Sequence, residues 1–407
     1  MTASPDRPEE STVTIMPGEI PFTITSAFAE PSEFLAHRAL NGPAQVRTST
    51  GDIGWLISRY ADVTTLCADS RIGKSHPDPA HAARLWYSEI FSPEGNYNTE
   101  LADHRRARRH LAKWYGPRRV ELMRPRMREI LDEQLRKVIA AGPPLDLKAH
   151  LITPFAAQVI YEFVGIPPAD REKIQAWSHH IRVRQDTYST TGRSELRQYI
   201  GDLLERKKQC PGQDAISGAV RSVSHARQHE QEDILKEISA FSLADQDVIG
   251  ARIAYGTLFL LQHQQQLQRL LDDRSLVAGA VEEVLRVAVP GGSWIPRYAL
   301  DDIDHSTADI RAGDLVVFAM QSANNDAAVF GDPGNFDITR SPNRHLAFGH
   351  GKFFCLGAHL SRTMLAVAFD GIFPRLPGLR LAVAAERVQL EDSRVTGGLR
   401  SLPVTWD

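Results

Sequence analysis

The chain has 407 residues, of which 42% are hydrophobic, and a formal net charge of −3. This hydrophobic share is enough for a sizeable core, and the small net charge excludes a general attraction to nucleic acid or to an anionic membrane. The three cysteines, Cys67, Cys210 and Cys355, are too few and too scattered for a disulfide framework. They fit a reducing cytosol, so we expect a cytoplasmic protein.

The polar, proline-bearing segment 1–20 predicts a disordered lead without a signal peptide or a membrane anchor. Residues 21–407 are expected to form a single domain. A strand over 54–60 is followed by a short helix from Ala61. The stretch 73–100 contains prolines and aromatic residues without a clear period, which predicts a loop long enough to suspect a function.

The rest of the chain is dominated by helical periodicity, with proline and glycine at the ends of the periodic stretches. Two further strand regions are expected within 294–320 and over 400–406. Helices are expected within 104–141, 154–164, 180–230, 232–271 and 277–287. The predicted fold class is therefore mainly α with small β-sheets.

The most specific pattern is a cysteine at the end of a glycine-punctuated loop, Phe348-Gly349-His350-Gly351-Lys352-Phe353-Phe354-Cys355-Leu356-Gly357. The glycines let the backbone pass close to a flat group, and such a loop can direct backbone N–H groups at the sulfur, which favours the thiolate. A thiolate held in this way is the ligand of haem iron in enzymes that split dioxygen. The simpler interpretation, a buried core cysteine, leaves the glycines unexplained.

This loop resembles the haem-binding loop of the cytochrome P-450 family, and the chain resembles the soluble bacterial type. The resemblance implies the cytochrome P-450 fold, with haem b between a long distal helix and the Cys355 loop. It also implies a haem-thiolate oxidoreductase, a monooxygenase that acts on a small-molecule substrate. Cys355 is then the metal ligand, and the loop residues that help to bind the cofactor are Phe348, Gly349, Gly351 and Gly357.

A weaker pattern supports the same resemblance. Glu283 and Arg286 are three residues apart on a predicted helix, a spacing that allows a local ion pair. The surrounding segment 280–286 is similar to the helix that precedes the small sheet in the family, where this pair locks the core behind the haem. Arg340 is the expected third partner.

Haem carries two propionates, which need cationic partners, and arginine can bind a carboxylate through two hydrogen bonds. His104 and Arg108 match the family's His-x-x-x-Arg, and Arg297 matches its strand arginine. The resemblance therefore assigns these three residues to the propionates, although His104 alone could be a surface histidine. The family often has His or Arg two residues before the cysteine, where this chain has Phe353. One propionate contact is then lost or is supplied by another residue.

A dense basic stretch follows His104, and a solvated face is the simplest interpretation for most of it. In the family this helix borders the surface near the cysteine, where a basic patch would attract an acidic ferredoxin. We therefore expect a ferredoxin and its ferredoxin reductase as electron donors, and no nucleic acid partner. The residues concerned are Arg105, Arg106, Arg108, Arg109, Arg118, Arg119, Arg124, Arg126 and Arg128.

The segment 243–249 departs from the family's distal helix, which usually carries an acid followed by a threonine to deliver protons to oxygen. Asp247 keeps the acid, whereas Val248 replaces the hydroxyl and Asp245 replaces a glycine. Thr257 lies nine residues too late to substitute. The candidate catalytic residues are therefore Asp247 and Asp245, with ordered water or the substrate's own O–H or N–H as other proton sources.

The missing hydroxyl leaves two reactions open. One is oxidative coupling or cyclisation, in which hydrogen is taken twice from an aromatic peptide or cyclic dipeptide and a C–C, C–N or C–O bond forms. The other is ordinary hydroxylation with Val248 as a tolerated variation. A non-catalytic relative that activates a partner enzyme is the alternative from another class, and the retained Cys355 argues against it. For either reaction, we expect the enzyme to act in bacterial secondary metabolism.

The family's layout also indicates which residues face the substrate. Aromatic side chains among them could stack on an aromatic substrate, although packing under a lid explains any one of them equally well. The candidates are Trp86, Tyr87, Phe91, Tyr97, Ala244, Val248, Ser293, Trp294 and Thr396.

Overall fold

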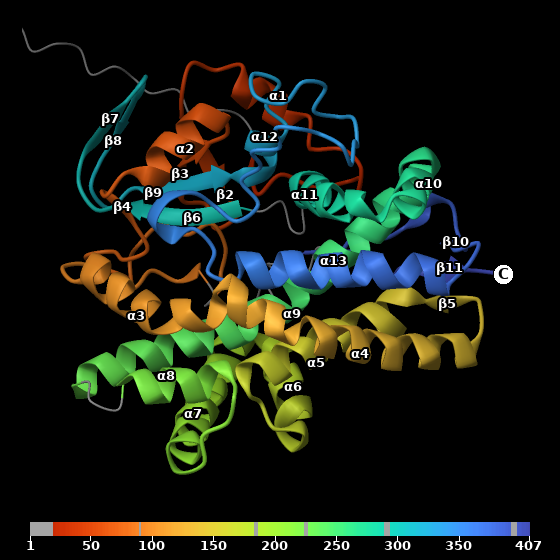
Figure 1. Cartoon of the computed structure of the whole chain (residues 1–407). Coiled ribbons are helices and arrows are strands. Elements are labelled where there is room, and N and C mark those ends of the chain that lie inside the picture. Colours follow the sequence, from red (N-terminus) through yellow and green to blue (C-terminus); the bar gives the residue numbers. More distant parts are fainter. Residues whose placement is uncertain (1–18, 89–90, 183–185, 224–226, 289–293, 392–396) are drawn as a thin grey trace, which may run out of the picture.

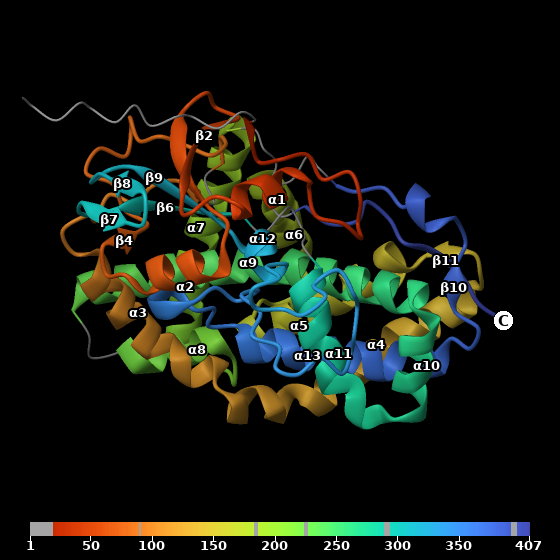
Figure 2. The same ribbon diagram turned by 90° about the horizontal axis from the view of Figure 1, so that it is seen from above.

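A computed structural model describes residues 19–88, 91–182, 186–223, 227–288, 294–391 and 397–407. Helices fill one side of the molecule, and a twisted sheet with a few short helices forms the other (Figures 1 and 2). This arrangement confirms the expected mainly α fold with small sheets. Of the expected disordered lead, residues 1–18 lie outside the described part, while Glu19 and Ile20 form a strand.

The largest sheet has six strands, in the order β1-β2-β3-β9-β6-β4. Its centre is β9, which pairs with β3 in parallel and with β6 in antiparallel orientation, and all five residues of β9 are buried. Three strands form a second sheet, β10-β11-β5, and β7 pairs with β8. The bounds are β1 Glu19–Ile20, β2 Ala44–Thr48, β3 Ile53–Ile57, β4 Ile72–Gly73, β5 Leu145–Asp146, β6 Trp294–Ala299, β7 Ile303–His305, β8 Ala308–Ile310, β9 Leu315–Ala319, β10 Arg380–Leu381 and β11 Pro403–Thr405.

Every stretch that was predicted to be helical contains helix. The stretches 104–141 and 232–271 are each divided between two helices. The helical stretch within 104–141 breaks at Gly116, whose extended backbone precedes Pro117 at the start of a new helix, as residues before proline favour. The bounds are α1 Glu33–Arg38, α2 Tyr60–Ala68, α3 Glu100–Tyr115, α4 Pro117–Ala141, α5 Thr153–Val164, α6 Arg171–Arg182, α7 Asp186–Gln209, α8 Ala215–Val223, α9 Gln228–Gln262, α10 Gln264–Asp272, α11 Val277–Val287, α12 Met320–Asn324 and α13 Ala358–Arg375.

The long helix α9 runs through the helical side and packs against α5, α3, α11 and α13. A side chain at Gly256 of α9 would meet the ring of Phe369 at 2.3 Å and a methyl group of Val284 at 2.8 Å, so glycine is needed where α9, α11 and α13 meet. No described helix combines the length and apolar character needed to span a bilayer.

Glu283 and Arg286 of α11 form the predicted ion pair, and both side chains are fully buried. The guanidinium of Arg286 donates to both carboxylate oxygens of Glu283, at 2.7 and 2.9 Å. Arg340 donates to the same carboxylate, so its prediction as the third partner is confirmed. Arg286 also donates to the carbonyls of Pro333 and Asn335. These bonds hold the segment that leads into the cysteine loop against α11.

Candidate functional site

The Cys355 loop is a tight turn that ends where α13 begins. The backbone N–H of Cys355 donates to the carbonyl of Phe348 at 2.9 Å, and Gly349 and Gly351 have the positive φ angles of 71° and 67° that glycine adopts without strain. Cys355 lies three residues before Ala358, the first residue of α13, where the helix dipole favours a negative charge on sulfur.

The loop rests on the C-terminal end of α2. A side chain at Gly351 would lie 2.5 Å from the carbonyl oxygen of Cys67, so only glycine fits this approach. The ammonium of the next residue, Lys352, donates to the carbonyls of Asp69 and Ser70, at 2.9 Å each. Gly351 therefore serves a close contact between backbones that the sequence did not reveal.

A cavity of about 400 Å³ lies between the Cys355 loop, α9 and strand β6. Cys355, Phe348, Gly349 and Phe353 line it from the loop, and most of the other lining side chains are apolar. They are Cys67, Ile72, Phe91, Val248, Arg252, Trp294, Ile295, Arg297, Phe318, Met320, Ala347 and His350. This lining suits a flat, apolar macrocycle with carboxylate groups at one edge. Cys355 could bind its metal, the apolar side chains could cover its faces, and Arg297 could pair with a carboxylate.

The three residues assigned to the propionates gather at Phe353. The guanidinium of Arg297 lies 5.1 Å from the centre of the Phe353 ring, and the ring of His104 lies 4.8 Å from it. Arg108 donates to the carbonyl of Phe354 at 2.8 Å. Burial lowers the pKa of Arg297, and burial, helped by the charge of Lys74, lowers the pKa of His104 to about 4. A carboxylate at this edge of the cavity would offset the cost of burying the charged forms of Arg297 and His104.

Val248 and Asp247 line different cavities on either side of α9. Val248 lines the cavity of Cys355, whereas Asp247 lines a polar cavity of about 320 Å³ with Ser178 of α6 and Gly398, which lies before β11. Thr257 is buried, and its hydroxyl donates to the carbonyl of Ile253 within its own helix, so it takes no part in either cavity. Ala244 and Asp245 lie on α9, but their side chains are outside the described part.

Arg252 is a cavity residue that the sequence analysis missed. It lies one helical turn after Val248, and its guanidinium donates to the carbonyl of Leu285 at 2.9 Å. Burial lowers its pKa to about 10, so it keeps its charge at neutral pH. The i, i+4 spacing from Val248 was the available signal. Cys67 was missed in the same way, because only the folded α2 brings it to the cavity.

The substrate-facing candidates separate into several groups. Phe91 and Trp294 line the cavity with Val248, and the buried Trp86 packs behind Phe91 with ring centres 5.8 Å apart. Tyr87 is 52% exposed. The hydroxyl of Tyr97 donates to the carbonyl of Leu300. Ser293 and Thr396 lie outside the described residues.

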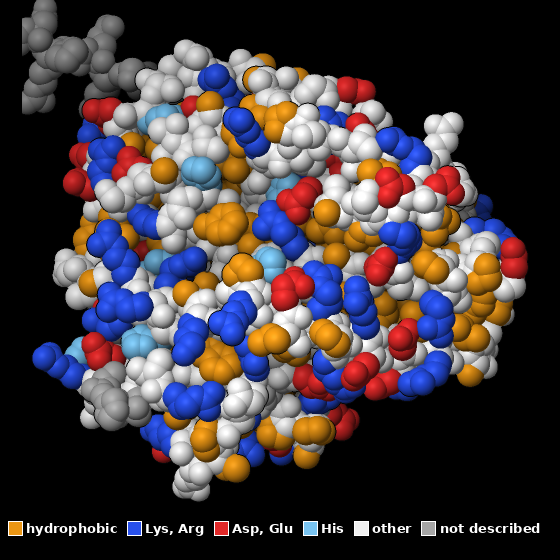
Figure 3. All heavy atoms as spheres, in the orientation of Figure 1, with side chains coloured by type: hydrophobic (Ala, Val, Ile, Leu, Met, Phe, Trp, Pro, Cys, Tyr) orange, Lys and Arg blue, Asp and Glu red, His pale blue; other side chains and the backbone are white. Residues whose placement is uncertain are grey.

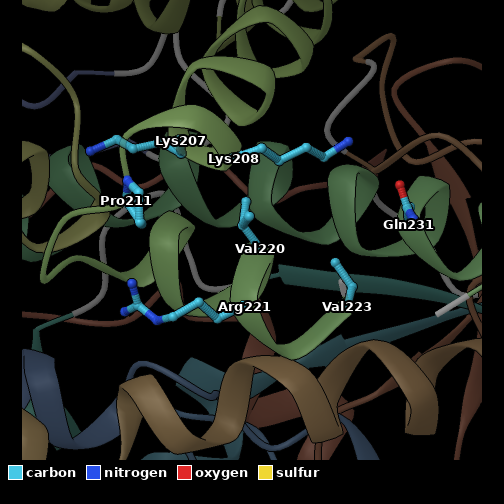
Figure 4. Close-up of a pocket in the computed structure, with 7 residues that line it drawn as sticks. All are labelled: Lys207, Lys208, Pro211, Val220, Arg221, Val223 and Gln231. Carbon is cyan, nitrogen blue, oxygen red and sulfur yellow. The ribbon is translucent and has the colours of Figure 1, made fainter. Parts of the chain in front are cut away.

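Figure 4 shows another hollow, of about 390 Å³, bordered by α7, α8 and α9. Two lysines at its rim are paired with carboxylates: Lys207 with Asp214 at 2.7 Å, and Lys208 with Glu205 at 2.6 Å. None of the predicted site residues lines it. The cavity beside Cys355 is therefore the candidate functional site.

Lysine and arginine side chains gather on the surface over α3, next to the Cys355 loop (Figure 3). Arg105 and Arg109 are exposed, and neither has an ion pair within the described residues. Other arginines of the basic stretch are paired: Arg106 with Asp103, Arg124 with Glu121, and Arg126 with Glu129, Glu133 and Glu162. Arg105 and Arg109 therefore leave uncompensated charge on α3, and Arg118, Arg119 and Arg128 of α4 also have no ion pair within the described residues.

Comparisons with known proteins agree with this site. The family model of cytochrome P-450 matches residues 258–375, which include Cys355. The chain is 34% identical to pentalenolactone synthase of Streptomyces exfoliatus, over 90% of this chain and 93% of that protein. It is 32% identical to mycinamicin IV hydroxylase/epoxidase of Micromonospora griseorubida, over 89% of this chain and 92% of that protein.

Solved structures give the same result. The putative thioether synthase SgvP, involved in the tailoring step of griseoviridin, superposes with a TM-score of 0.87 and is 30% identical, covering 95% of this chain and 99% of that one. The cysteine loop, the cavity and these similarities lead to one conclusion: the chain belongs to the cytochrome P-450 family and is a haem-thiolate monooxygenase that binds haem b.

Proposed function

We propose that the protein oxidises a small natural product in bacterial secondary metabolism, with Cys355 as the axial ligand of the haem. The observation that carries this proposal is the cavity in which Cys355 faces apolar and aromatic side chains from α9 and β6. The relatives named a synthase and a hydroxylase/epoxidase act on compounds of this kind. When bound, the haem supplies the activation of dioxygen, and the protein supplies the ligand, the pocket and the charges around it.

His104, Arg108 and Arg297 are proposed to hold the propionates. Arg297 lines the cavity, His104 packs against the ring of Phe353, and Arg108 donates to the carbonyl of the next residue, Phe354. Because the pKa of His104 is lowered to about 4, it is neutral at pH 7, and its Nε2–H donates to the carbonyl of Lys352 at 3.1 Å. The two arginines then provide the charge at this site.

We further propose that the reaction is an oxidative coupling or cyclisation of an aromatic peptide or cyclic dipeptide. Val248 presents only methyl groups to the cavity, so no hydroxyl at this position can pass protons to bound oxygen. Protons must then enter from the Asp247 side of α9 or come from an O–H or N–H of the substrate. Phe91 and Trp294 offer aromatic faces to such a substrate.

The coupling balances without oxygen entering the product. The substrate gives up two hydrogen atoms and gains one C–C, C–N or C–O bond. Dioxygen takes these two hydrogens, two electrons from the electron donor and two protons, and leaves as two molecules of water. Hydroxylation is the second candidate, favoured by the relative named a hydroxylase/epoxidase.

The electron donor is proposed to be an acidic ferredoxin, supplied by its reductase. Arg105 and Arg109 present uncompensated charge on α3, beside the loop that carries Cys355. Such a patch accelerates the encounter with an acidic partner and orients it toward the nearby sulfur ligand.

Product mass decides between the two reactions. A panel of aromatic cyclic dipeptides and short Tyr/Trp peptides, with macrolides, terpenes and fatty acids, is first screened by the high-spin shift of the ferric Soret band. The compound that shifts the band is then turned over under ¹⁸O₂. Loss of two hydrogens without label supports coupling, whereas one labelled oxygen in the product rejects coupling and establishes hydroxylation.

A further inference from the structure

We propose that Lys74 binds a haem propionate and supplies the cation that the cysteine loop lacks at Phe353. Lys74 follows the short strand β4 and precedes the loop that leads to α3. It lies far from Cys355 in the sequence and belongs to none of the motifs of the loop or of the His104 helix. The proposal rests on haem as the cofactor, not on the reaction it carries out.

Several cationic groups surround the ring of Phe353, which itself lines the cavity. The ammonium nitrogen of Lys74 lies 5.3 Å from the ring centre, that of Lys352 lies 5.2 Å away, and the guanidinium carbon of Arg297 lies 5.1 Å away. An aromatic face attracts cations, so the Phe353 ring holds these three cationic side chains close to the cavity. Their charge replaces the charge that a histidine or arginine at position 353 would have carried. Propionates at this edge of the cavity would meet these groups.

Lys74 differs from its neighbours because its ammonium is uncommitted. Lys352 donates to the carbonyls at the end of α2, and Arg297 donates to the carbonyl of Pro296 at 2.7 Å. Among the residues that the structure describes, the ammonium of Lys74 has neither a hydrogen bond nor an ion pair, and its contact is the Phe353 ring. A half-buried cation in this state gains most from an added carboxylate.

The backbone of Lys74 is fixed to the helix that carries the other propionate residues. The carboxylate of Glu100, 2% exposed, accepts hydrogen bonds from the backbone N–H groups of Lys74 and Ser75, at 2.8 and 2.9 Å. Glu100 begins α3, and His104 and Arg108 follow one and two turns later on the same face. Glu100 therefore holds Lys74 in a constant position relative to His104 and Arg108.

The test measures haem retention rather than catalysis. Ferric holoenzyme is mixed with excess apomyoglobin, and the rate of haem transfer is followed for the parent, Lys74→Met, Lys74→Arg and Lys113→Met. Lys113 is an exposed lysine of α3 without a hydrogen bond or ion pair in the described chain, so its variant removes the same charge away from the cavity. The ferric–ferrous potential and the reduced CO spectrum are recorded for each variant.

Lys74→Met should lose the haem-binding contribution of one charge-assisted hydrogen bond. We therefore expect its haem to transfer to apomyoglobin about 10-fold faster than that of the parent. The potential of Lys74→Met should also fall, because a cation beside the propionates favours the reduced state. Lys74→Arg should stay within about 2-fold of the parent, since it keeps the charge and the donors. An unchanged thiolate-type CO spectrum shows that the loop is intact in each variant. Haem transfer from Lys74→Met at the rate of the parent and of Lys113→Met would overturn the proposal, as would equal acceleration in Lys74→Arg.

Discussion

The guanidinium of Arg340 donates to both carboxylate oxygens of Glu283, at 3.2 Å each, across a gap of 57 residues in the sequence. Arg286 and the amide of Asn343 donate to the same carboxylate, which is fully buried. One buried anion thus joins α11 to the segment that precedes the cysteine loop. Its many donors offset the cost of removing the charge from water.

Removal of this anion should destabilise the protein strongly. Glu283→Gln leaves two guanidinium groups facing each other without a counter-charge, and breaking a buried pair in this way costs about 3–5 kcal/mol. Arg340→Met should cost less, because Arg286 still pairs with the carboxylate. Thermal unfolding of the haem-bound variants measures the difference. Equal unfolding temperatures for the two variants would contradict the role of Glu283 as the shared anion.

Two cysteines line the same cavity, and only one is expected to bind iron. Burial raises the pKa of Cys67 to about 11, so its thiol stays protonated at neutral pH, whereas Cys355 precedes the N-terminus of α13. Cys355→Ser should abolish the thiolate-type Soret band of the reduced CO complex, and Cys67→Ser should keep it. The absorption spectra of the two purified variants test this directly. A retained band in Cys355→Ser would refute the assignment.

Restoring the missing hydroxyl tests the source of protons. If the substrate supplies its own proton, Val248→Thr should change native turnover by less than about 3-fold, well below the 10²–10⁴-fold range of general acid–base catalysis. Val248→Ala, which alters the wall without adding a hydroxyl, is the matched control. A large gain with threonine alone would show that proton delivery limits the parent enzyme. Turnover is measured with the compound identified by the Soret screen.

Acid should weaken the contact between α11 and α13. Burial opposes ionisation of Glu282, but hydrogen bonds from His345 and Arg362 outweigh it and lower the pKa of Glu282 from its usual 4.5 to about 2. Because the pKa is lower in the folded state, this group stabilises the protein above about pH 4.5 and loses the effect as the pH falls toward 2. Urea unfolding between pH 2 and 6 should show a smaller pH dependence for Glu282→Gln than for the parent. Parallel curves would exclude this contribution.

Reversal of charge on α3 should weaken electron transfer. Arg105→Glu with Arg109→Glu should raise the KM for an acidic ferredoxin by about 10-fold or more at low salt, and the difference should shrink at high salt. Arg47→Glu, an exposed arginine of β2, is the control and should leave the KM unchanged. Reduction of the haem by ferredoxin under stopped flow measures the effect. Equal salt dependence in all variants would argue against this docking surface.

The sequence predicted elements well where a local signal decided them. The helix over 277–287 was placed within its observed bounds, because its apolar period stops shortly before Pro290 in the sequence. Arg340 was predicted from the resemblance to the family, although Asn335 stands where the family often has its arginine. In contrast, Cys67 reaches the cavity only through the packing of α2, and the one local signal for Arg252 is its i, i+4 spacing from Val248. Lys74 has no such local signal, because its neighbours come from α3, β6 and the cysteine loop.

The cofactor loop and the end of α2 are joined by Gly351, which touches the carbonyl of Cys67, and by Lys352, which bonds to Asp69 and Ser70. Neither segment can open without breaking these contacts, so they form a single cooperative unit. Amide protons in the last turn of α2 should therefore exchange more slowly once haem is bound. Exchange with deuterated solvent at residues 66–69 then reports occupancy of the haem site from a helix that lies outside the cysteine loop.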